Sequence, residues 1–251
     1  VGLFDLVLFR KVREAFGGSL EFFVGGGALL DSELQRFFYA IGIPMFQGYG
    51  LSEATPVIST NSPKYHWHKF GSSGKILEPL DLKILDEEGR ELPRGQKGEI
   101  VIRGENVMAG YWKNPDATAA TVRNGWLHTG DMGTMDPDGT LYIRGRSKTM
   151  ILSGNGQNIY PEEIEDKLNN MYMVLESLVL DAGNGRLRAL VVPDYEQADA
   201  EGVDKSELPQ IMQNNLQELN AQLAAYERVS DITIYPTEFE KTPKRSIKRF
   251  L

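Results

Sequence analysis

The sequence of 251 residues contains no cysteine and only three histidines. The lack of cysteine excludes disulfide bonds, thiolate zinc sites and cysteine nucleophiles, and it fits a reducing compartment. The cluster His66-Trp67-His68 raises the question of a metal or stacking site. A metal site is the less favoured interpretation, because the chain offers few nitrogen ligands and no thiolate.

Basic charge and long apolar runs are scarce as well. Lys and Arg total 27 against 35 Asp and Glu, which gives a net charge of -8 and a pI of about 5.1. A nucleic-acid partner is therefore disfavoured, since contact with phosphates needs a basic surface. No stretch resembles a signal peptide or is long enough to span a bilayer. We expect a cytoplasmic protein that is not an integral membrane protein.

What is present is the composition of an ordinary globular protein. Hydrophobic residues make up 41% and charged residues 25%, which allows one large or two modest domains. The first residues, Val1-Gly2-Leu3-Phe4, do not look like an initiating terminus, and apolar residues already recur there at helical spacing. We therefore expect the chain to be part of a longer protein.

Helices and strands are predicted to alternate in residues 1–60. The apolar spacing predicts a helix at 3–16, a strand at 20–24, a helix after the N-cap Asp31 with Leu34, Phe37, Phe38 and Ile41 on one face, and a strand at 43–46. Glycine-rich loops, Gly25–Ala28 and Gly48–Gly50, follow the two strands. In a parallel βαβ sheet both loops lie at the edge where ligands bind.

The pattern changes further along the chain. Residues 70–146 contain short alternating runs separated by turn sequences such as Asp136-Pro137-Asp138-Gly139, which predicts a small antiparallel barrel or sheet with one helix near Pro115 to Thr121. After Lys148 the sequence predicts a helix from Pro161, a hairpin around Gly183–Gly185, a helix at 208–226 and a strand at 232–235.

These patterns predict an α/β plus α+β fold in two domains. Residues 1–147 are expected to form the C-terminal part of a large domain, with a βαβ portion at 1–60 and a β-barrel portion at 70–147. Residues 148–251 are expected to form a small mobile α+β domain. The boundary is placed near Arg146 to Lys148, where the helix and strand alternation resumes.

The stretch Gly48-Tyr49-Gly50-Leu51-Ser52-Glu53 offers groups that suit a nucleotide. Glycines allow the backbone to approach closely, the ring gives a stacking face, and a hydroxyl and a carboxylate can serve a phosphate and its Mg²⁺. Read alone, the stretch more often marks a turn after a buried strand, with Glu53 starting a helix.

Two further stretches follow in a fixed order. They are Trp126-Leu127-His128-Thr129-Gly130-Asp131 and Gly145-Arg146-Ser147-Lys148, which continues to Gly156-Gln157-Asn158-Ile159-Tyr160-Pro161-Glu162-Glu163-Ile164-Glu165. With the glycine stretch they resemble the adenylate-forming superfamily of acyl-CoA synthetases, firefly luciferase and peptide-synthetase adenylation domains. The resemblance covers nearly the whole chain and is strongest to long-chain fatty acid–CoA ligases.

The resemblance implies roles for the nucleotide-binding residues. Gly26, Gly27 and Ala28 would line the adenine, and Tyr49, between Gly48 and Gly50, would stack on it. Ser52 would touch the α-phosphate and Glu53 would hold Mg²⁺. Asp131 and Arg146 would bind the ribose hydroxyls. Without the resemblance, the glycines are as well explained by tight turns and Asp131 by a capping role in a surface turn. His128 is interpreted as structural rather than as a base.

The resemblance also implies a moving small domain. Lys148 would be the hinge about which this domain rotates between an adenylation pose and a thioester-forming pose. Gly156 would lie beside the phosphopantetheine of coenzyme A. The alternative for Lys148 is an ordinary surface lysine.

The C-terminal segment Lys241–Arg249 departs from the family pattern. The family has a lysine here that steadies the carboxylate and the phosphates during adenylation, and this position falls on Ser246. Either Lys244 or Lys248 takes over this role, or the half-reaction is weakened. The basic cluster has two other interpretations, a solvated tail and a peripheral contact with an anionic membrane.

As a whole, the resemblance implies an ATP- and Mg²⁺-dependent ligase that converts a long-chain fatty acid to acyl-AMP and then, with coenzyme A, to acyl-CoA and AMP. The family's phosphate loop is not found in these residues, so we predict that the chain alone does not catalyse adenylation. One alternative is an enzyme that stops at acyl-AMP or loads a carrier-protein thiol. Another is a non-catalytic nucleotide-binding module.

Overall fold

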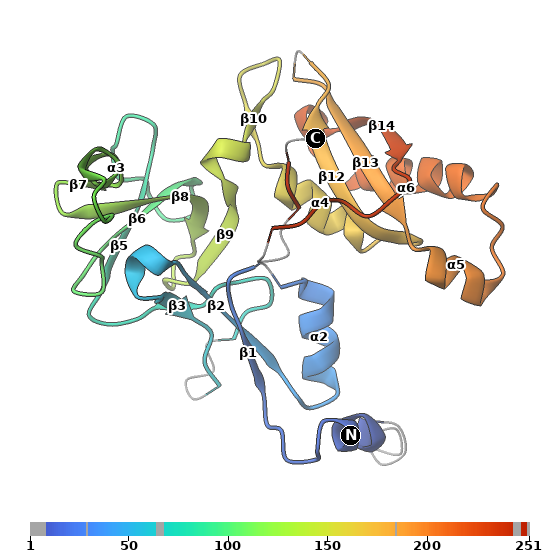
Figure 1. The fold of residues 1–251 in the computed structure, drawn as a ribbon, viewed down its shortest axis with the longest axis horizontal. Helices are drawn as coiled ribbons and strands as arrows, with labels where there is room; N and C mark the ends of the chain where they lie inside the picture. The colour runs from blue at the N-terminus through green and yellow to red at the C-terminus, as the bar shows by residue number, and fades with distance from the viewer. Residues whose placement is uncertain (1–8, 29, 64–67, 184, 243–246, 250–251) are drawn as a thin grey trace. The chain divides into compact units, whose positions relative to one another are not determined.

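The computed structural model describes residues 9–28, 30–63, 68–183, 185–242 and 247–249. The chain, drawn as a ribbon in Figure 1, divides into two compact units, residues 1–144 and 145–251. Each unit has a hydrophobic core of its own. Both combine helices with sheet, as the predicted α/β plus α+β fold class requires. The two units are described separately below.

The first sheet of unit 1 contains the predicted βαβ arrangement. Its strands are β1 (Phe23–Gly25), β2 (Met45–Gly50), β3 (Val57–Thr60) and β4 (Lys75–Ile76), in the order β1-β2-β3-β4. Strand β1 is parallel to β2, whereas the other pairs are antiparallel. Helix α2 (Ser32–Ala40) connects β1 to β2, and the short helix α1 (Arg10–Ala15) lies within the helix predicted at 3–16.

Helix α2 begins as predicted, but its predicted apolar stripe is buried only in part, at Ile41 and partly at Phe38. The Asp31 carboxylate accepts a hydrogen bond of 2.6 Å from the backbone N–H of Leu34, which confirms the N-cap. Of the predicted apolar stripe, Phe37 remains 52% exposed, whereas Gln35 is fully buried. The buried amide is satisfied because it donates to the carbonyl oxygen of Leu30 at 2.9 Å.

The predicted loop at Gly48–Gly50 is instead the second half of strand β2. These residues pair with β3, with Gly48 opposite Thr60 and Gly50 opposite Val57. A Cβ at Gly50 would overlap the carbonyl oxygen of Pro56. The glycines therefore permit close packing of two strands here, where their pattern had suggested a turn.

The second sheet of unit 1 is the predicted antiparallel region. Its strands are β5 (Asp81–Leu85), β6 (Gly98–Arg103), β7 (Val122–Arg123), β8 (Trp126–Met135) and β9 (Leu141–Arg146), in the order β5-β6-β8-β7 with β9 also paired to β8. Helix α3 (Pro115–Thr121) matches the predicted short helix. Ile84, Ile100 and Leu127 form part of the core, together with Ala54 and Ile58 from the first sheet.

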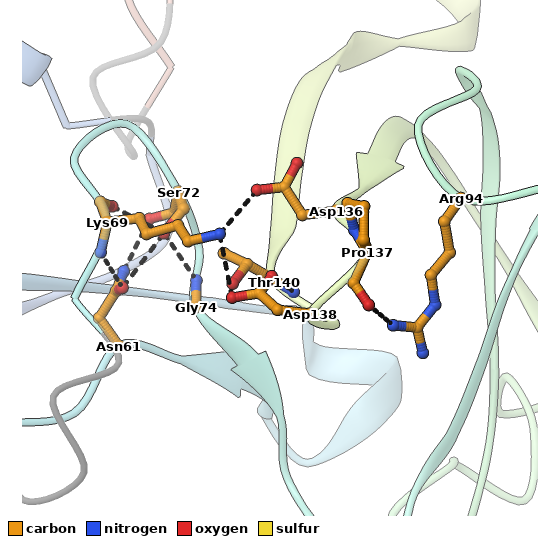
Figure 2. A network of polar contacts seen from close by, with 9 residues as sticks. All are labelled: Asn61, Lys69, Ser72, Gly74, Arg94, Asp136, Pro137, Asp138 and Thr140. Carbon is orange, nitrogen blue, oxygen red and sulfur yellow. Dashed lines mark hydrogen bonds and ion pairs between the residues drawn. The ribbon is translucent and has the colours of Figure 1, made fainter.

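A polar network joins the two sheets of unit 1 (Figure 2). The Lys69 ammonium lies 2.8 Å from Asp136 and 3.0 Å from Asp138, both in the turn between β8 and β9. On the other side, the amide of Asn61 donates to the Ser72 carbonyl oxygen at 2.8 Å. The segment after β3 is thereby attached to the predicted Asp-Pro-Asp-Gly turn.

Unit 2 is an α+β unit built on a three-stranded sheet. Its strands β12 (Val174–Asp181), β13 (Leu187–Pro193) and β14 (Val229–Ile234) lie in this order, with the first pair antiparallel and the second parallel. The helices are α4 (Pro161–Asn169), α5 (Tyr195–Glu201) and α6 (Leu208–Gln222), and a small hairpin joins β10 (Ile151–Leu152) to β11 (Asn158–Ile159). Helix α5 was not predicted, and α6 ends before residue 226. No described helix is long and apolar enough to cross a lipid bilayer.

The core of unit 2 lies between the sheet and its helices. Ile164 and Leu168 of α4, as predicted, and Met212 and Leu219 of α6 pack with residues of β12 and β13. Pro161 occupies the first turn of α4, where a missing N–H costs nothing. This packing fixes α4, and with it the acidic end of the Gly156–Glu165 motif.

Candidate functional site

Tyr49 on β2 and Asp131 on β8 are distant in the sequence but adjacent in unit 1. The Tyr49 hydroxyl donates a hydrogen bond of 2.7 Å to Asp131 Oδ2. Asp131 is only 6% exposed, whereas Tyr49 is half-buried. The Gly48–Glu53 stretch and the Thr129-Gly130-Asp131 stretch therefore meet at one place.

Asp131 is presented by a strand, not by the tight turn that the sequence suggested. It lies within β8, where the register between β6 and β8 shifts and Gly130 adopts a φ of 68°. The Thr129 hydroxyl donates to the carbonyl oxygen of Ile100 at 2.7 Å, and it accepts from the Asp131 N–H at 3.1 Å. This irregularity turns the carboxylate toward Tyr49.

Glu99 holds the same irregular part of β8 from the neighbouring strand. Its carboxylate lies 2.8 Å from Nδ1 of His128 and accepts a hydrogen bond of 3.2 Å from the Gly130 N–H. His128 thus pairs with a carboxylate of the neighbouring strand, and its structural role stays a prediction. Glu99 was not identified, because only the pairing of β6 with β8 brings it to the motif.

The loop that contains Gly26, Gly27 and Ala28 is exposed and held by Gln47. The Gln47 amide donates to the Ala28 carbonyl oxygen at 3.2 Å and accepts from the Leu30 N–H at 3.0 Å. A Cβ at Gly26 would lie 3.5 Å from the carbonyl oxygen of Gly48. The two glycine-rich stretches are therefore neighbours, joined by a buried glutamine that the sequence did not single out.

Ser52 and Glu53 follow β2 in a single helical turn, η2 (Ser52–Ala54). Ser52 is exposed, and the backbone of Glu53 is fixed because its carbonyl oxygen accepts from the Met108 N–H at 2.8 Å. The Tyr111 hydroxyl donates to Glu53 Oε1 at 2.8 Å, and this hydrogen bond raises the pKa of Tyr111 above its usual value. Tyr111 had no signal in the sequence.

The donor set near Glu53 limits what metal it could hold. Among the described residues, no three His, Cys, Asp or Glu side chains gather in a way that could bind a metal ion. A single carboxylate fits Mg²⁺ only where phosphate oxygens and water supply the other ligands, which is how Mg²⁺ commonly binds with a nucleotide. Glu53 is compatible with that arrangement.

Three predicted site residues lie in unit 2 near its beginning. Arg146 and Lys148 are exposed, and Lys148 lies in a single helical turn, η3 (Ser147–Thr149). Gly156 has a φ of 80° in the turn between β10 and β11, where its N–H donates to the Ser153 carbonyl oxygen at 2.9 Å. Their predicted roles in ribose binding, rotation and coenzyme A passage stay predictions.

The C-terminal segment is partly described. The Lys248 ammonium lies 3.0 Å from the Glu240 carboxylate, and its side chain is 50% exposed. Lys244 and Ser246, the other two residues predicted to matter here, lie outside the described residues, as do His66 and Trp67. The neighbouring His68 is surrounded by the rings of Tyr39, Phe46 and Phe70.

Family models match both parts of the chain. Residues 4–112 match the model of AMP-binding enzymes, and residues 148–250 match the model of the AMP-binding enzyme C-terminal domain. A 2-succinylbenzoate–CoA ligase of Bacillus cytotoxicus is 41% identical over 174 residues, which cover 69% of this chain and 36% of the relative. A long-chain fatty acid–CoA ligase of Escherichia coli is 42% identical over 166 residues, which cover 65% of this chain and 29% of the relative.

Solved structures show the same similarity in three dimensions. The O-succinylbenzoate coenzyme A synthetase of Bacillus subtilis, in complex with AMP, matches with a TM-score of 0.77 and 28% identity over 96% of this chain and 48% of that chain. The chain thus spans less than half the length of each of these three proteins. With both family models matched, the chain belongs to the AMP-binding enzymes of the adenylate-forming superfamily.

Proposed function

We propose that the chain is the C-terminal part of a longer acid–CoA ligase that uses ATP and Mg²⁺. In the first half-reaction the acid's carboxylate attacks the α-phosphorus of ATP, so that acyl-AMP forms and pyrophosphate leaves. In the second, the thiol of coenzyme A attacks the acyl carbon, so that acyl-CoA forms and AMP leaves. The protein contributes by positioning and by neutralising charge, without a covalent intermediate on a side chain.

The observation that carries the proposal is the 2.7 Å hydrogen bond between Tyr49 and Asp131. It places an aromatic ring beside a carboxylate, at a spacing that one nucleoside can reach with its base and its ribose. Glu53 follows on the same strand-to-turn segment, where it can share Mg²⁺ with the phosphates. Bound Mg²⁺ would supply charge neutralisation at the phosphates, and Tyr111 would keep the Glu53 carboxylate in place.

The preferred acid is a long-chain fatty acid. The sequence of the Gly156–Glu165 motif and the Lys-Thr-Pro sequence at Lys241 favour the long-chain fatty acid branch of the family, as does the similarity to the Escherichia coli fatty acid ligase. The similarity to a 2-succinylbenzoate–CoA ligase favours an aromatic acid instead. The rate of AMP release from ATP, measured with each of a panel of acids, shows which acid is the preferred substrate. The same measurement without coenzyme A identifies an enzyme that stops at acyl-AMP, because AMP release then does not depend on coenzyme A.

The nucleotide site is tested by replacing Asp131 with Asn in the longer protein. A carboxylate that accepts from ribose hydroxyls contributes charge-assisted hydrogen bonds worth about 1.5 to 3 kcal/mol. We expect the KM for ATP to rise by about tenfold or more, since each 1.4 kcal/mol corresponds to a factor of ten. The KM for the acid should stay near that of the unchanged protein.

Asp81→Asn is the matched control, because Asp81 is exposed and its carboxylate pairs only with the surface residue Arg103 at 2.7 Å among the contacts described. Equal KM values for ATP in Asp131→Asn and Asp81→Asn would contradict the assignment of the ribose site. ATP binding without any acid-dependent release of AMP would favour the non-catalytic module.

A further inference from the structure

The acidic residues that end the Gly156–Glu165 motif have a partner at the far end of the chain. Arg249 makes a two-pronged contact with Glu165, with Nη1 at 2.9 Å from Oε1 and Nη2 at 2.6 Å from Oε2. Its Nη2 also lies 3.2 Å from Glu162 Oε1. The Arg249 side chain is 17% exposed and that of Glu165 is 11% exposed, so the pair is largely desolvated. A planar guanidinium in this geometry fixes direction as well as distance.

Helix α4 supplies the two carboxylates from one face. Glu162 and Glu165 are three residues apart, which places them on neighbouring turns of the helix surface. Glu165 also accepts a hydrogen bond of 2.7 Å from the Val179 N–H of β12. The clamp is therefore built on the packed core of unit 2 and is more rigid than a surface ion pair.

The segment before Arg249 is held at two places. At its start, the Glu176 carboxylate of β12 accepts from the Phe239 N–H at 2.7 Å and pairs with the Lys241 ammonium at 2.7 Å. At its end, the Lys248 N–H donates to the Glu240 carbonyl oxygen at 2.8 Å, and Arg249 follows directly. Lys248, one of the two lysines predicted to serve in adenylation, forms the second of these attachments through its backbone N–H.

Glu162 extends the clamp to the other end of unit 2. Its Oε1 lies 2.6 Å from the hydroxyl of Thr149, the residue after the predicted hinge Lys148. Its Oε2 is buried without a hydrogen-bond partner in the described part of the chain. A Cβ at Gly145 would lie 2.7 Å from this oxygen, and Gly145 has a φ of 148°. The glycine of the Gly145-Arg146 pair therefore makes room for the Glu162 carboxylate.

We propose that Arg249, Glu165 and Glu162 form a positioning clamp that fixes the C-terminal segment for adenylation and joins it through Thr149 to the hinge. The inference rests on the proposed function, because it assigns the clamp to one of the two half-reactions. The role assigned to these three residues is to position other groups, not to contact substrate or nucleotide. They act by holding the segment that carries Lys248.

The half-reactions of the longer protein test the clamp. In Arg249→Gln we expect acid-dependent ATP–pyrophosphate exchange to fall by tenfold or more, because the segment loses its end attachment. Thioester formation from supplied acyl-AMP should change less than threefold. Arg249→Lys should recover only part of the exchange rate, since an ammonium cannot make the two-pronged contact. Arg188→Gln is the matched control, because Arg188 is an exposed arginine of the same unit that pairs with Asp231 at 2.8 Å.

A second variant distinguishes a loss of positioning from a loss of stability. A single neutralisation leaves a buried charge, whereas the double variant Glu165→Gln/Arg249→Gln removes both charges and should unfold less readily than either single variant. We expect the double variant to keep the adenylation defect. If both half-reactions fall together in proportion to lost thermal stability, or if the double variant restores exchange, the clamp has no positioning role.

Hydrogen exchange gives a readout that does not depend on activity. The backbone amide of Lys248 should exchange at least tenfold faster in Arg249→Gln than in Arg188→Gln, because its bond to Glu240 loses support from the clamp. Unchanged protection of this amide would overturn the inference even if the enzyme is active. Absence of acid-dependent ATP–pyrophosphate exchange in the unchanged longer protein would instead contradict the proposed function. Hydrogen exchange at the Lys248 amide would still show whether the clamp holds the C-terminal segment.

Discussion

At the scale of single residues, the site depends on positions where a side chain has no room. Gly48 is one, since a Cβ there would lie 3.1 Å from the Ser59 carbonyl oxygen. Gly50 is stricter, because its Cβ would overlap the backbone of Pro56. In both cases the obstacle is backbone, which cannot move aside as a flexible side chain can.

We therefore expect Gly50→Ala to destabilise unit 1. Overpacking against a fixed backbone costs about 1 to 3 kcal/mol. A loss of this size lowers the melting temperature of a domain of this length by several degrees. Thermal unfolding followed by circular dichroism measures the shift. Gly25→Ala is the control, because a Cβ at Gly25 meets no atom within 4 Å and its φ is not positive. Equal melting temperatures of the two variants would contradict the prediction.

The sequence could identify site residues that belong to a recognisable stretch, and it could not identify those recruited by folding. Tyr49 and Asp131 were predicted to serve one ligand, and the structure brings them together. Tyr111, Gln47 and Glu99 carry no local pattern. Glu99 and Tyr111 reach the site only because segments distant in the sequence meet there. Gln47 directly precedes Gly48, but its bond to the Ala28 loop depends on the pairing of β1 with β2. Periodicity along the chain does not report such contacts.

At the scale of elements, the polar network of Figure 2 attaches the segment after β3 to the β8–β9 turn. The hydrogen bond from Lys69 lowers the pKa of Asp138 to about 2, and the hydrogen bonds to Asp136 and Asp138 raise the pKa of Lys69. The Arg94 guanidinium donates to the carbonyl oxygen of Pro137 in the same turn. The turn is thus held by two cations from different segments.

This network predicts a defined pH dependence. Since the folded-state pKa of Asp138 is lowered from 3.8, its contribution to stability is present above pH 3.8 and is lost as the pH falls toward 2. In Lys69→Met we expect the pKa of Asp138 to rise toward 3.8, measured by NMR titration of its carboxyl group. The acid-induced loss of stability between pH 4 and 2 should shrink accordingly. An unchanged Asp138 pKa in this variant would show that Lys69 is not its cause.

Element positions were predicted well where one physical requirement decides them. Asp31 and Pro161 mark helix starts because capping and the missing proline N–H act locally. The apolar face of α2 was predicted only in part, since Leu34 and Phe37 are exposed, and the end of β2 was predicted wrongly. Contacts with other elements override the local pattern there. Gln35 is buried since it bonds to Leu30, and Gly48–Gly50 extend since they pair with β3.

At the scale of the whole molecule, the chain spans 36% of one curated relative and 29% of another. The family's phosphate loop is not found among these residues, and without it the triphosphate lacks a cradle of backbone N–H groups. The parts that remain are the residues proposed to contact the base, the ribose and the metal. Nucleotide binding by these residues therefore does not imply that they catalyse the complete reaction.

We expect the purified 251-residue chain to show no acid-dependent ATP–pyrophosphate exchange. The longer protein should show it under the same conditions. Radiolabelled pyrophosphate incorporated into ATP measures both, with a panel of acids that includes long-chain fatty acids. Exchange by the 251-residue chain alone would refute this prediction and would mean that its own residues can hold the triphosphate.

The pairing of Gly48–Gly50 with β3 has a consequence for how a nucleoside would be received. A flexible glycine loop would have to lose conformational freedom on contact, at about 1 to 2 kcal/mol for each residue that becomes ordered. In β2 these residues are already ordered in the folded protein, so binding does not have to order them. A purine that docks against Tyr49 as proposed would meet a platform of fixed shape, so the bare and occupied backbones should superpose along this strand.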